Sequence, residues 1–267
     1  MRVDGELLDA AGASLRVVAN FAVGYDNVDV AACRERDVIV TNTPDVLTNA
    51  TAELAVALML AAARRLGEAE RLVRAGRWTG WEPNQLLGRE LSGAVVGIVG
   101  LGRIGTRVAE LLRGFGAELL YAARSRHPEA ERSLGAEHAA LEDLLERSDF
   151  VTLHVPLSPQ TRHLIDAHAL QRMKPGAILV NTSRGGLVDT AALARALREE
   201  RLGGAGLDVY EEEPQIPPEL MDLERVVLAP HIGSATATAR DGMAQLVAEN
   251  VIAVLEGRTP LTPVEPG

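Results

Sequence analysis

The sequence is poor in the residues that mark several classes of protein. Cys33 is the only cysteine among 267 residues, so one chain can build neither a disulfide framework nor a cysteine-based zinc site, and we expect no metal. Aromatic residues make up 3%, and Lys174 is the only lysine. The net charge of -10 favours neither a nucleic-acid partner nor a membrane partner.

Long hydrophobic runs are also lacking. The most apolar segment, residues 54–63, is too short to cross a bilayer, which needs about 20 residues. The N-terminus shows no secretory signal pattern. We therefore expect a cytoplasmic protein.

The composition that is present, 47% apolar and 24% charged residues, is typical of a globular protein with a sizeable core. From Val95 onward, short apolar runs alternate with segments of helical periodicity. This alternation predicts an α/β fold with an open, doubly wound parallel sheet. Strands are expected at 95–99, 118–122, 150–155, 177–180, 205–209 and 226–228, and helices at 104–115, 141–146, 167–173 and 191–202, with Asp166 and Thr190 as N-caps.

The flanking segments suggest the domain organisation. Residues 1–43 hold two strand-like runs and read as part of a domain, residues 44–235 as a dinucleotide-binding domain, and residues 236–267 as a helix and a Pro-rich tail that return toward the first part. A buried helix is expected over 50–65 with Gly67 as its C-cap. Residues 72–92, with Trp78 and Trp81, are expected to form an extended connector.

The turn after the first strand of the alternating region carries the pattern G-x-G-x-x-G in Gly100, Gly102 and Gly105. A buried strand precedes it and an amphipathic helix follows, which is the context that a Rossmann-type dinucleotide site requires. The glycines allow a tight turn and close approach of a pyrophosphate to the helix N-terminus. Gly100, Gly102, Arg103 and Ile104 are therefore predicted to contact the cofactor; a turn without a ligand is the alternative.

The end of the second strand suggests which dinucleotide binds. NAD-binding folds place a carboxylate there for the ribose 2′-hydroxyl, whereas this strand is followed by Arg124, Ser125 and Arg126. Arginine can pair with a 2′-phosphate. We predict a preference for NADP(H), with NAD(H) as the other cofactor. The alternative is that the two arginines are solvated loop residues.

The sequence carries three further motifs beyond the Gly-rich turn: residues 181–186 (NTSRGG), 206–214 (GLDVYEEEP) and 229–236 (APHIGSAT). With the Gly-rich turn, they resemble the D-isomer-specific 2-hydroxyacid dehydrogenase family over residues 7–257. The resemblance is greatest to its glyoxylate/hydroxypyruvate reductase branch. It implies a partial flavodoxin-like substrate (lid) domain beside the Rossmann-type domain, because roughly the first half of that family's substrate domain has no counterpart here.

The resemblance assigns roles to individual residues. It implies that Arg184 grips a small 2-oxo acid, that His231 donates the proton and that Glu213 supports His231. Asp208 would orient the nicotinamide amide. The implied substrate contacts are Val23, Gly24, Arg184 and His231, and the implied cofactor contacts besides the Gly-rich turn and the arginine loop are Thr51, Val155, Pro156, Thr182, Asp208, His231 and Gly233.

The chemistry of these residue types agrees with such roles. Hydride delivery to a ketone builds negative charge on oxygen, which a histidine can protonate near neutral pH, and a carboxylate stabilises the imidazolium. His154 is interpreted as a packing residue, and Glu211 and Glu212 as solvated members of an acidic run. A surface histidine at 231 and a surface arginine at 184 are the alternatives.

Other functions stay open at this stage. A phosphoglycerate or D-lactate dehydrogenase would belong to the same family, and a non-catalytic, cofactor-sensing interaction protein belongs to a different class. The family is usually dimeric, so we expect a homodimer, with the helix near Val56 and the Trp78–Trp81 connector as the candidate interface.

Overall fold

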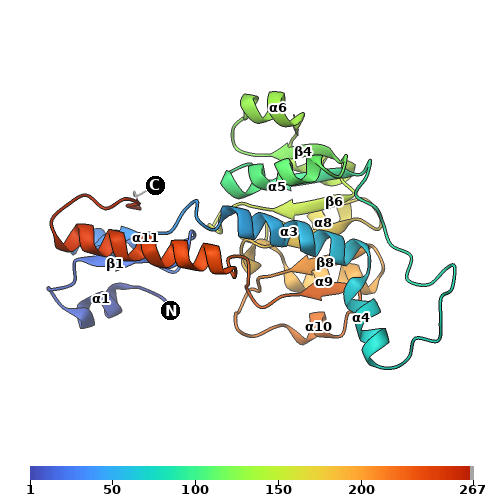
Figure 1. The fold of residues 1–267 in the computed structure, drawn as a ribbon, viewed down its shortest axis with the longest axis horizontal. Helices are drawn as coiled ribbons and strands as arrows, with labels where there is room; N and C mark the ends of the chain where they lie inside the picture. Colours follow the sequence, from blue (N-terminus) through green and yellow to red (C-terminus); the bar gives the residue numbers. More distant parts are fainter. Residues whose placement is uncertain (265–267) are drawn as a thin grey trace. The chain divides into compact units, whose positions relative to one another are not determined.

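The computed structural model describes residues 1–264, which form two compact units (Figure 1). The larger unit is Thr51–Gly233, and the smaller one combines Met1–Ala50 with the chain from Ser234 onward. The sequence placed these boundaries at 43/44 and 235/236. No helix of residues 1–264 combines the length and the apolar character needed to cross a membrane.

The larger unit is built on a seven-stranded sheet in which every neighbouring pair is parallel, as the alternating pattern predicted. The strand order is β5-β4-β3-β6-β7-β8-β9, so the direction of winding reverses between β3 and β6. Ligands bind at such a switch point, beyond the carboxyl ends of the strands. The strands are β3 (Val95–Val99), β4 (Glu118–Ala122), β5 (Glu137–His138), β6 (Phe150–Leu153), β7 (Ile178–Asn181), β8 (Gly204–Leu207) and β9 (Val226–Leu228).

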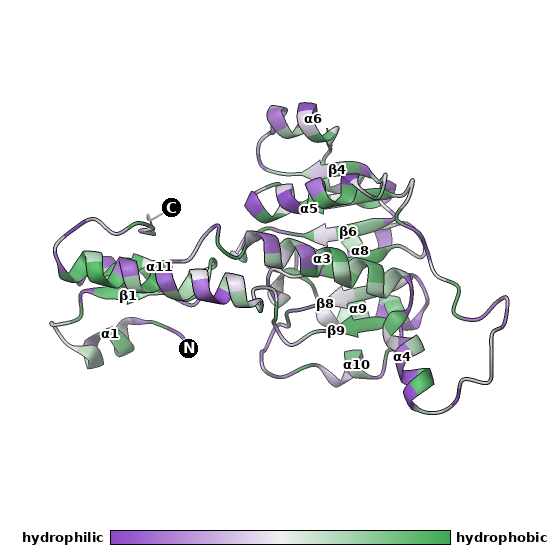
Figure 2. Cartoon of the chain, viewed as in Figure 1, coloured by the Kyte–Doolittle hydropathy of each residue, from purple (hydrophilic) through white to green (hydrophobic). Residues whose placement is uncertain are grey.

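Helices cover both faces of this sheet, and each face has its own core. One core is formed with α3 (Thr48–Ala63), α5 (Arg103–Arg113) and α6 (Pro128–Leu134). The other is formed with α7 (Leu141–Arg147), α8 (Ala167–Arg172), α9 (Thr190–Arg198) and α10 (Pro218–Met221). Figure 2 shows the apolar residues concentrated in the sheet, with hydrophilic residues on outer helices such as α6.

Several local expectations are corrected by the structure. The helix expected over 50–65 is α3, which ends at Ala63 and has no C-cap at Gly67. Arg65 adopts a left-handed conformation, with φ of 51°, and Gly67 lies inside a second helix, α4 (Leu66–Arg74). The cap of α9 is Asp189, whose side chain accepts a hydrogen bond from Ala192 N, and not Thr190. The sequence also gave no sign of the short elements α6 and β5.

The smaller unit has a two-stranded parallel sheet of β1 (Val17–Ala19) and β2 (Ile39–Thr41). Its helices are α1 (Gly5–Ala11), α2 (Val30–Arg34) and α11 (Ala237–Leu255). The C-terminal helix is tied to this sheet, because Arg16 beside β1 donates to the carbonyl oxygens of Val254 and Leu255 at 2.6 and 3.0 Å.

Candidate active site

The Gly-rich turn lies at the switch point of the sheet, where β3 and β6 end. Gly100 has a φ of +95°, and a β-carbon there would lie 2.8 Å from the carbonyl oxygen of His154 and 2.7 Å from Val155. A β-carbon on Gly105 would lie 2.1 Å from the oxygen of Gly100. Only glycine allows both approaches, so the turn stays tight and α5 begins directly beneath it.

Two features near the switch point fit a dinucleotide. A β-carbon on Gly102 would meet nothing within 4 Å, so the backbone is open to a ligand at the helix N-terminus. Beyond β7, the buried hydroxyl of Thr182 has no hydrogen-bond partner among residues 1–264. A buried hydroxyl without a partner is costly, and a bound cofactor would supply one. The residues present therefore fit the nicotinamide dinucleotide that the sequence predicted.

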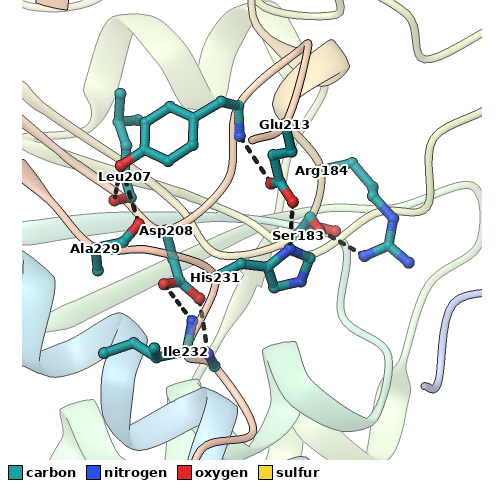
Figure 3. A network of polar contacts seen from close by, with 10 residues as sticks. Ser183, Arg184, Leu207, Asp208, Glu213, Ala229, His231 and Ile232 are labelled. Carbon is teal, nitrogen blue, oxygen red and sulfur yellow. Dashed lines mark hydrogen bonds and ion pairs between the residues drawn. The ribbon is translucent and has the colours of Figure 1, made fainter. Parts of the chain in front are cut away.

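His231 and Glu213 form a hydrogen-bonded pair, which is shown in Figure 3. The Nδ1 atom of His231 lies 2.7 Å from a carboxylate oxygen of Glu213. Because a carboxylate only accepts, Nδ1 carries the hydrogen, and Nε2 is left to exchange a proton with another group. The other oxygen of Glu213 accepts from the backbone N–H of Tyr210 at 3.1 Å, which fixes the carboxylate.

The loop that carries His231 is held by Asp208, at the end of β8. The buried carboxylate accepts from the N–H groups of Ile232 and Gly233 at 2.7 and 2.8 Å (Figure 3). Burial raises the pKa of Asp208, and these two hydrogen bonds oppose that rise. The Thr51 hydroxyl also donates to the Gly233 carbonyl at 3.2 Å. Asp208 and Thr51 thus position the histidine loop, and their implied contacts with the nicotinamide stay predictions.

His231 itself has a φ of 54°, a conformation that is uncommon outside glycine. Its backbone N–H donates to the Asp208 carbonyl at 2.9 Å, which holds it there. Residues in such conformations persist where the surrounding structure fixes them, and they gather at functional sites. The His231 side chain is 51% exposed, but a histidine with no role beyond the surface would need no such support.

Arg184 lies on the turn after β7, next to the loop that carries Glu213 (Figure 3). One guanidinium nitrogen donates to the Ser183 carbonyl at 2.8 Å, and the Asn181 side chain donates to the Arg184 carbonyl at 2.8 Å. A β-carbon on Gly185 would lie 1.9 Å from the carbonyl carbon of Tyr210. The backbones of the two loops are therefore in direct contact, which places Arg184 and Glu213 on neighbouring loops.

Glu211 is not the solvated residue that the sequence suggested. Its carboxylate lies 2.9 Å from Nε2 of His163, accepts from the N–H of Thr190 at 3.2 Å and lies 3.4 Å from Arg162. Burial raises the pKa of Glu211, but the hydrogen bonds from His163 and Thr190 more than offset this, so the pKa is lowered. These partners are about 20 and 50 residues away along the chain, so the local sequence carries no signal that Glu211 makes these contacts.

A carboxylate of α6 contacts the arginine loop, residues 124–126, and the sequence at the end of β4 did not reveal it. Arg126 pairs with Glu131 of α6 through two hydrogen bonds of 3.0 and 2.7 Å. Arg124 and Ser125 are exposed. The predicted 2′-phosphate site therefore has two arginines in different electrostatic surroundings.

The remaining predicted residues divide between the two units. Val155 contacts the Gly-rich turn, and the Pro156 carbonyl accepts from Thr161 at 2.7 Å. Val23 and Gly24 belong to the smaller unit, where the side chains of Asn42 and Asn20 donate to their carbonyl oxygens at 2.8 and 2.7 Å. Their contact with a substrate stays a prediction.

His154, interpreted from the sequence as a packing residue, lies just past β6. Its Nε2 atom is 2.9 Å from the Thr152 hydroxyl. Burial lowers the pKa of His154 from 6.5 to about 4, so the imidazole is neutral at ordinary pH.

Comparisons with known proteins show the family to which the chain belongs. Residues 56–233 match the model of the D-isomer specific 2-hydroxyacid dehydrogenase NAD-binding domain. The chain belongs to this family. A glyoxylate reductase from Thermococcus kodakarensis is 56% identical over 265 residues, which are 98% of this chain and 79% of that protein.

Solved structures of family members share the fold. An NADPH-dependent glyoxylate/hydroxypyruvate reductase from Sinorhizobium meliloti, in complex with NADP and malonate, is 40% identical with a TM-score of 0.90 over 98% of this chain and 81% of that one. A glyoxylate reductase from Paecilomyes thermophila is 39% identical with a TM-score of 0.90, covering 98% and 79%.

Proposed function

We propose that this dehydrogenase reduces glyoxylate or hydroxypyruvate to the corresponding 2-hydroxy acid, of D configuration where the product is chiral. NADPH is the preferred electron donor and NADH the alternative. The observation that carries the proposal is the His231–Glu213 pair, 2.7 Å apart, on loops that also place Arg184. The relatives named glyoxylate reductase support the choice of substrate.

The residues of the site divide the work of the reaction. Arg184 binds the 2-oxo acid through its guanidinium, which suits a carboxylate or a carbonyl oxygen. When bound, the reduced nicotinamide supplies the hydride to the carbonyl carbon. His231 gives a proton from Nε2 to the carbonyl oxygen, whose π electrons become the new O–H bond. Glu213 stabilises the imidazolium before this transfer and fixes the ring.

The residues at the switch point of the sheet would bind the cofactor. The Gly-rich turn, with Gly100 and Gly102, and the first residues of α5, Arg103 and Ile104, would hold the pyrophosphate through backbone N–H groups. The Thr182 hydroxyl would gain the partner that it lacks among residues 1–264. Arg124 and Ser125 would face the ribose.

Two substitutions test the proposal. H231A should lower kcat for glyoxylate by about 10²-fold or more, and R184A should lower kcat/KM by a similar factor, because general acid catalysis and oriented binding are worth that much. The dissociation constant of NADPH, measured by fluorescence titration, should change little in both. H168A, which alters an exposed histidine of α8, is the control.

Unchanged turnover in H231A would refute the proposal. Faster turnover of phosphoglycerate, of D-lactate or of another 2-hydroxy acid, or of the corresponding 2-oxo acid, in parallel assays would reassign the substrate. NADPH binding without turnover of any 2-oxo acid would favour the non-catalytic alternative.

We further propose a cytoplasmic homodimer. Val56 of α3 is buried in the core of its own unit, whereas Ala57 on the same helix is exposed and Leu54 and Leu60 are only partly buried, so α3 stays in the candidate interface through that face. Trp78 and Trp81 are 55% and 82% exposed, which is unusual for so large an apolar side chain, and support the connector as the interface. A monomer in light scattering at micromolar concentration would contradict this.

A further inference from the structure

The arginine loop after β4 is organised around Glu131, a residue of α6. One carboxylate oxygen accepts from the Tyr121 hydroxyl at 2.6 Å and from Nε of Arg126 at 3.0 Å. The other accepts from a terminal nitrogen of Arg126 at 2.7 Å. The Tyr121 hydroxyl in turn accepts from the backbone N–H of His127 at 2.7 Å, so one network fixes both ends of residues 121–127.

Glu131 carries a full negative charge in this network. The hydrogen bonds from Arg126 and then from Tyr121 lower the pKa of Glu131 to about 2. Its side chain is 19% exposed, whereas that of Arg126 is 68% exposed. The charge of Arg126 is therefore balanced by a bidentate partner, although its guanidinium reaches the surface.

Arg124 lies two residues earlier in a different environment. It is exposed, and it makes no hydrogen bond or ion pair with any residue in 1–264. Arg124 can therefore bind a phosphate without giving up an existing partner, whereas Arg126 must share its guanidinium with Glu131. An anion brought to Arg126 would also be repelled by the Glu131 carboxylate.

We propose that Glu131 sets the strength of discrimination between NADPH and NADH by neutralising Arg126, so that Arg124 alone supplies most of the attraction for the 2′-phosphate. This rests on the proposed use of NADPH. Glu131 is thus a specificity-determining residue that acts through Arg126 and touches no part of the cofactor.

The test compares R124A, R126A, E131Q and the double variant R126A/E131Q. Binding of adenosine 2′,5′-bisphosphate and of 5′-AMP to the intact protein is measured by calorimetry, and kcat/KM is measured with NADPH and NADH. Glutamine keeps an oxygen for the Tyr121 hydroxyl but removes the charge, so the loop is expected to keep its fold, and thermal unfolding of each variant checks this.

The preference for the 2′-phosphate is the ratio of kcat/KM with NADPH to that with NADH, or of the two nucleotide affinities. R124A should lower this ratio about tenfold or more, and R126A by less than threefold. E131Q should raise it several-fold, with a steeper dependence on salt, because Arg126 becomes available. In the R126A background, E131Q should have a much smaller effect on the preference, limited to the loss of direct repulsion by the carboxylate.

The proposal is overturned if R126A lowers the preference as much as R124A, if E131Q leaves it unchanged, or if E131Q raises it equally without Arg126. A wild-type enzyme that uses NADH more efficiently would defeat the proposed cofactor preference instead. The comparison of E131Q with and without Arg126 would still decide the role of Glu131.

Discussion

Replacement of Gly185 by alanine should separate the two loops that form the proposed catalytic site. A β-carbon at this position would lie 1.9 Å from the Tyr210 carbonyl carbon, 2.2 Å from its oxygen and 2.3 Å from the Glu211 nitrogen. These are backbone atoms, so no side-chain rotation relieves the clash. Since carbon atoms pack at about 3.5 Å, the loops must move apart by roughly 1.5 Å.

The consequence for catalysis follows from what the two loops carry. Arg184 precedes Gly185 on one loop, and Tyr210 on the other donates to Glu213, the partner of His231. A misplacement of this size can cost about 10²-fold in rate, or about 2.7 kcal/mol of transition-state stabilisation. Overpacking should also lower the free energy of unfolding by about 1–3 kcal/mol.

The assay is steady-state reduction of glyoxylate together with urea unfolding. G186A is the matched control, because a β-carbon at Gly186 meets only the flexible end of Leu157 at 3.2 Å and Arg162 at 3.6 Å. We expect G186A to retain most of the activity. If G185A turned over as fast as G186A, close contact between the loops would not be what assembles the site.

Substitutions at three further positions test other parts of the structure. D208A leaves two backbone N–H groups of the histidine loop without acceptors and should cost about 1–3 kcal/mol in urea unfolding; an unchanged midpoint would argue against that role. E211A should lower both thermal stability and kcat. E211Q should keep much of the stability because its side-chain oxygen still accepts from Thr190. Equal losses of thermal stability in the two variants would contradict this reasoning. His154 has a lowered pKa in the folded protein, so the unfolded chain binds more protons between pH 6.5 and about 4. The free energy of unfolding should therefore fall as the pH drops through that window, by about 3 kcal/mol. H154N should remove this dependence in urea unfolding measured at each pH, and an unchanged slope would refute the reasoning.

Some parts of the candidate site were predictable because their signals are local. The strand, the glycines at 100, 102 and 105, and the following helix are adjacent in sequence, and steric limits on a tight turn apply to any chain that makes one. The motifs around Arg184 and His231 could likewise be found by resemblance. Short elements such as β5 could not, because two residues carry no periodicity.

The sequence by itself determined the alternation of strands and helices, and with it the parallel sheet and the edge at which a ligand binds, because apolar periodicity and turn-forming residues act over short distances. Only the tertiary structure decided the partners of the charged side chains. Glu211 was interpreted from the sequence as a solvated carboxylate and Glu131 carried no signal there, yet each accepts hydrogen bonds that hold a loop. The physical reason is that an ion pair depends on distance in space, which the fold sets and the order of residues does not.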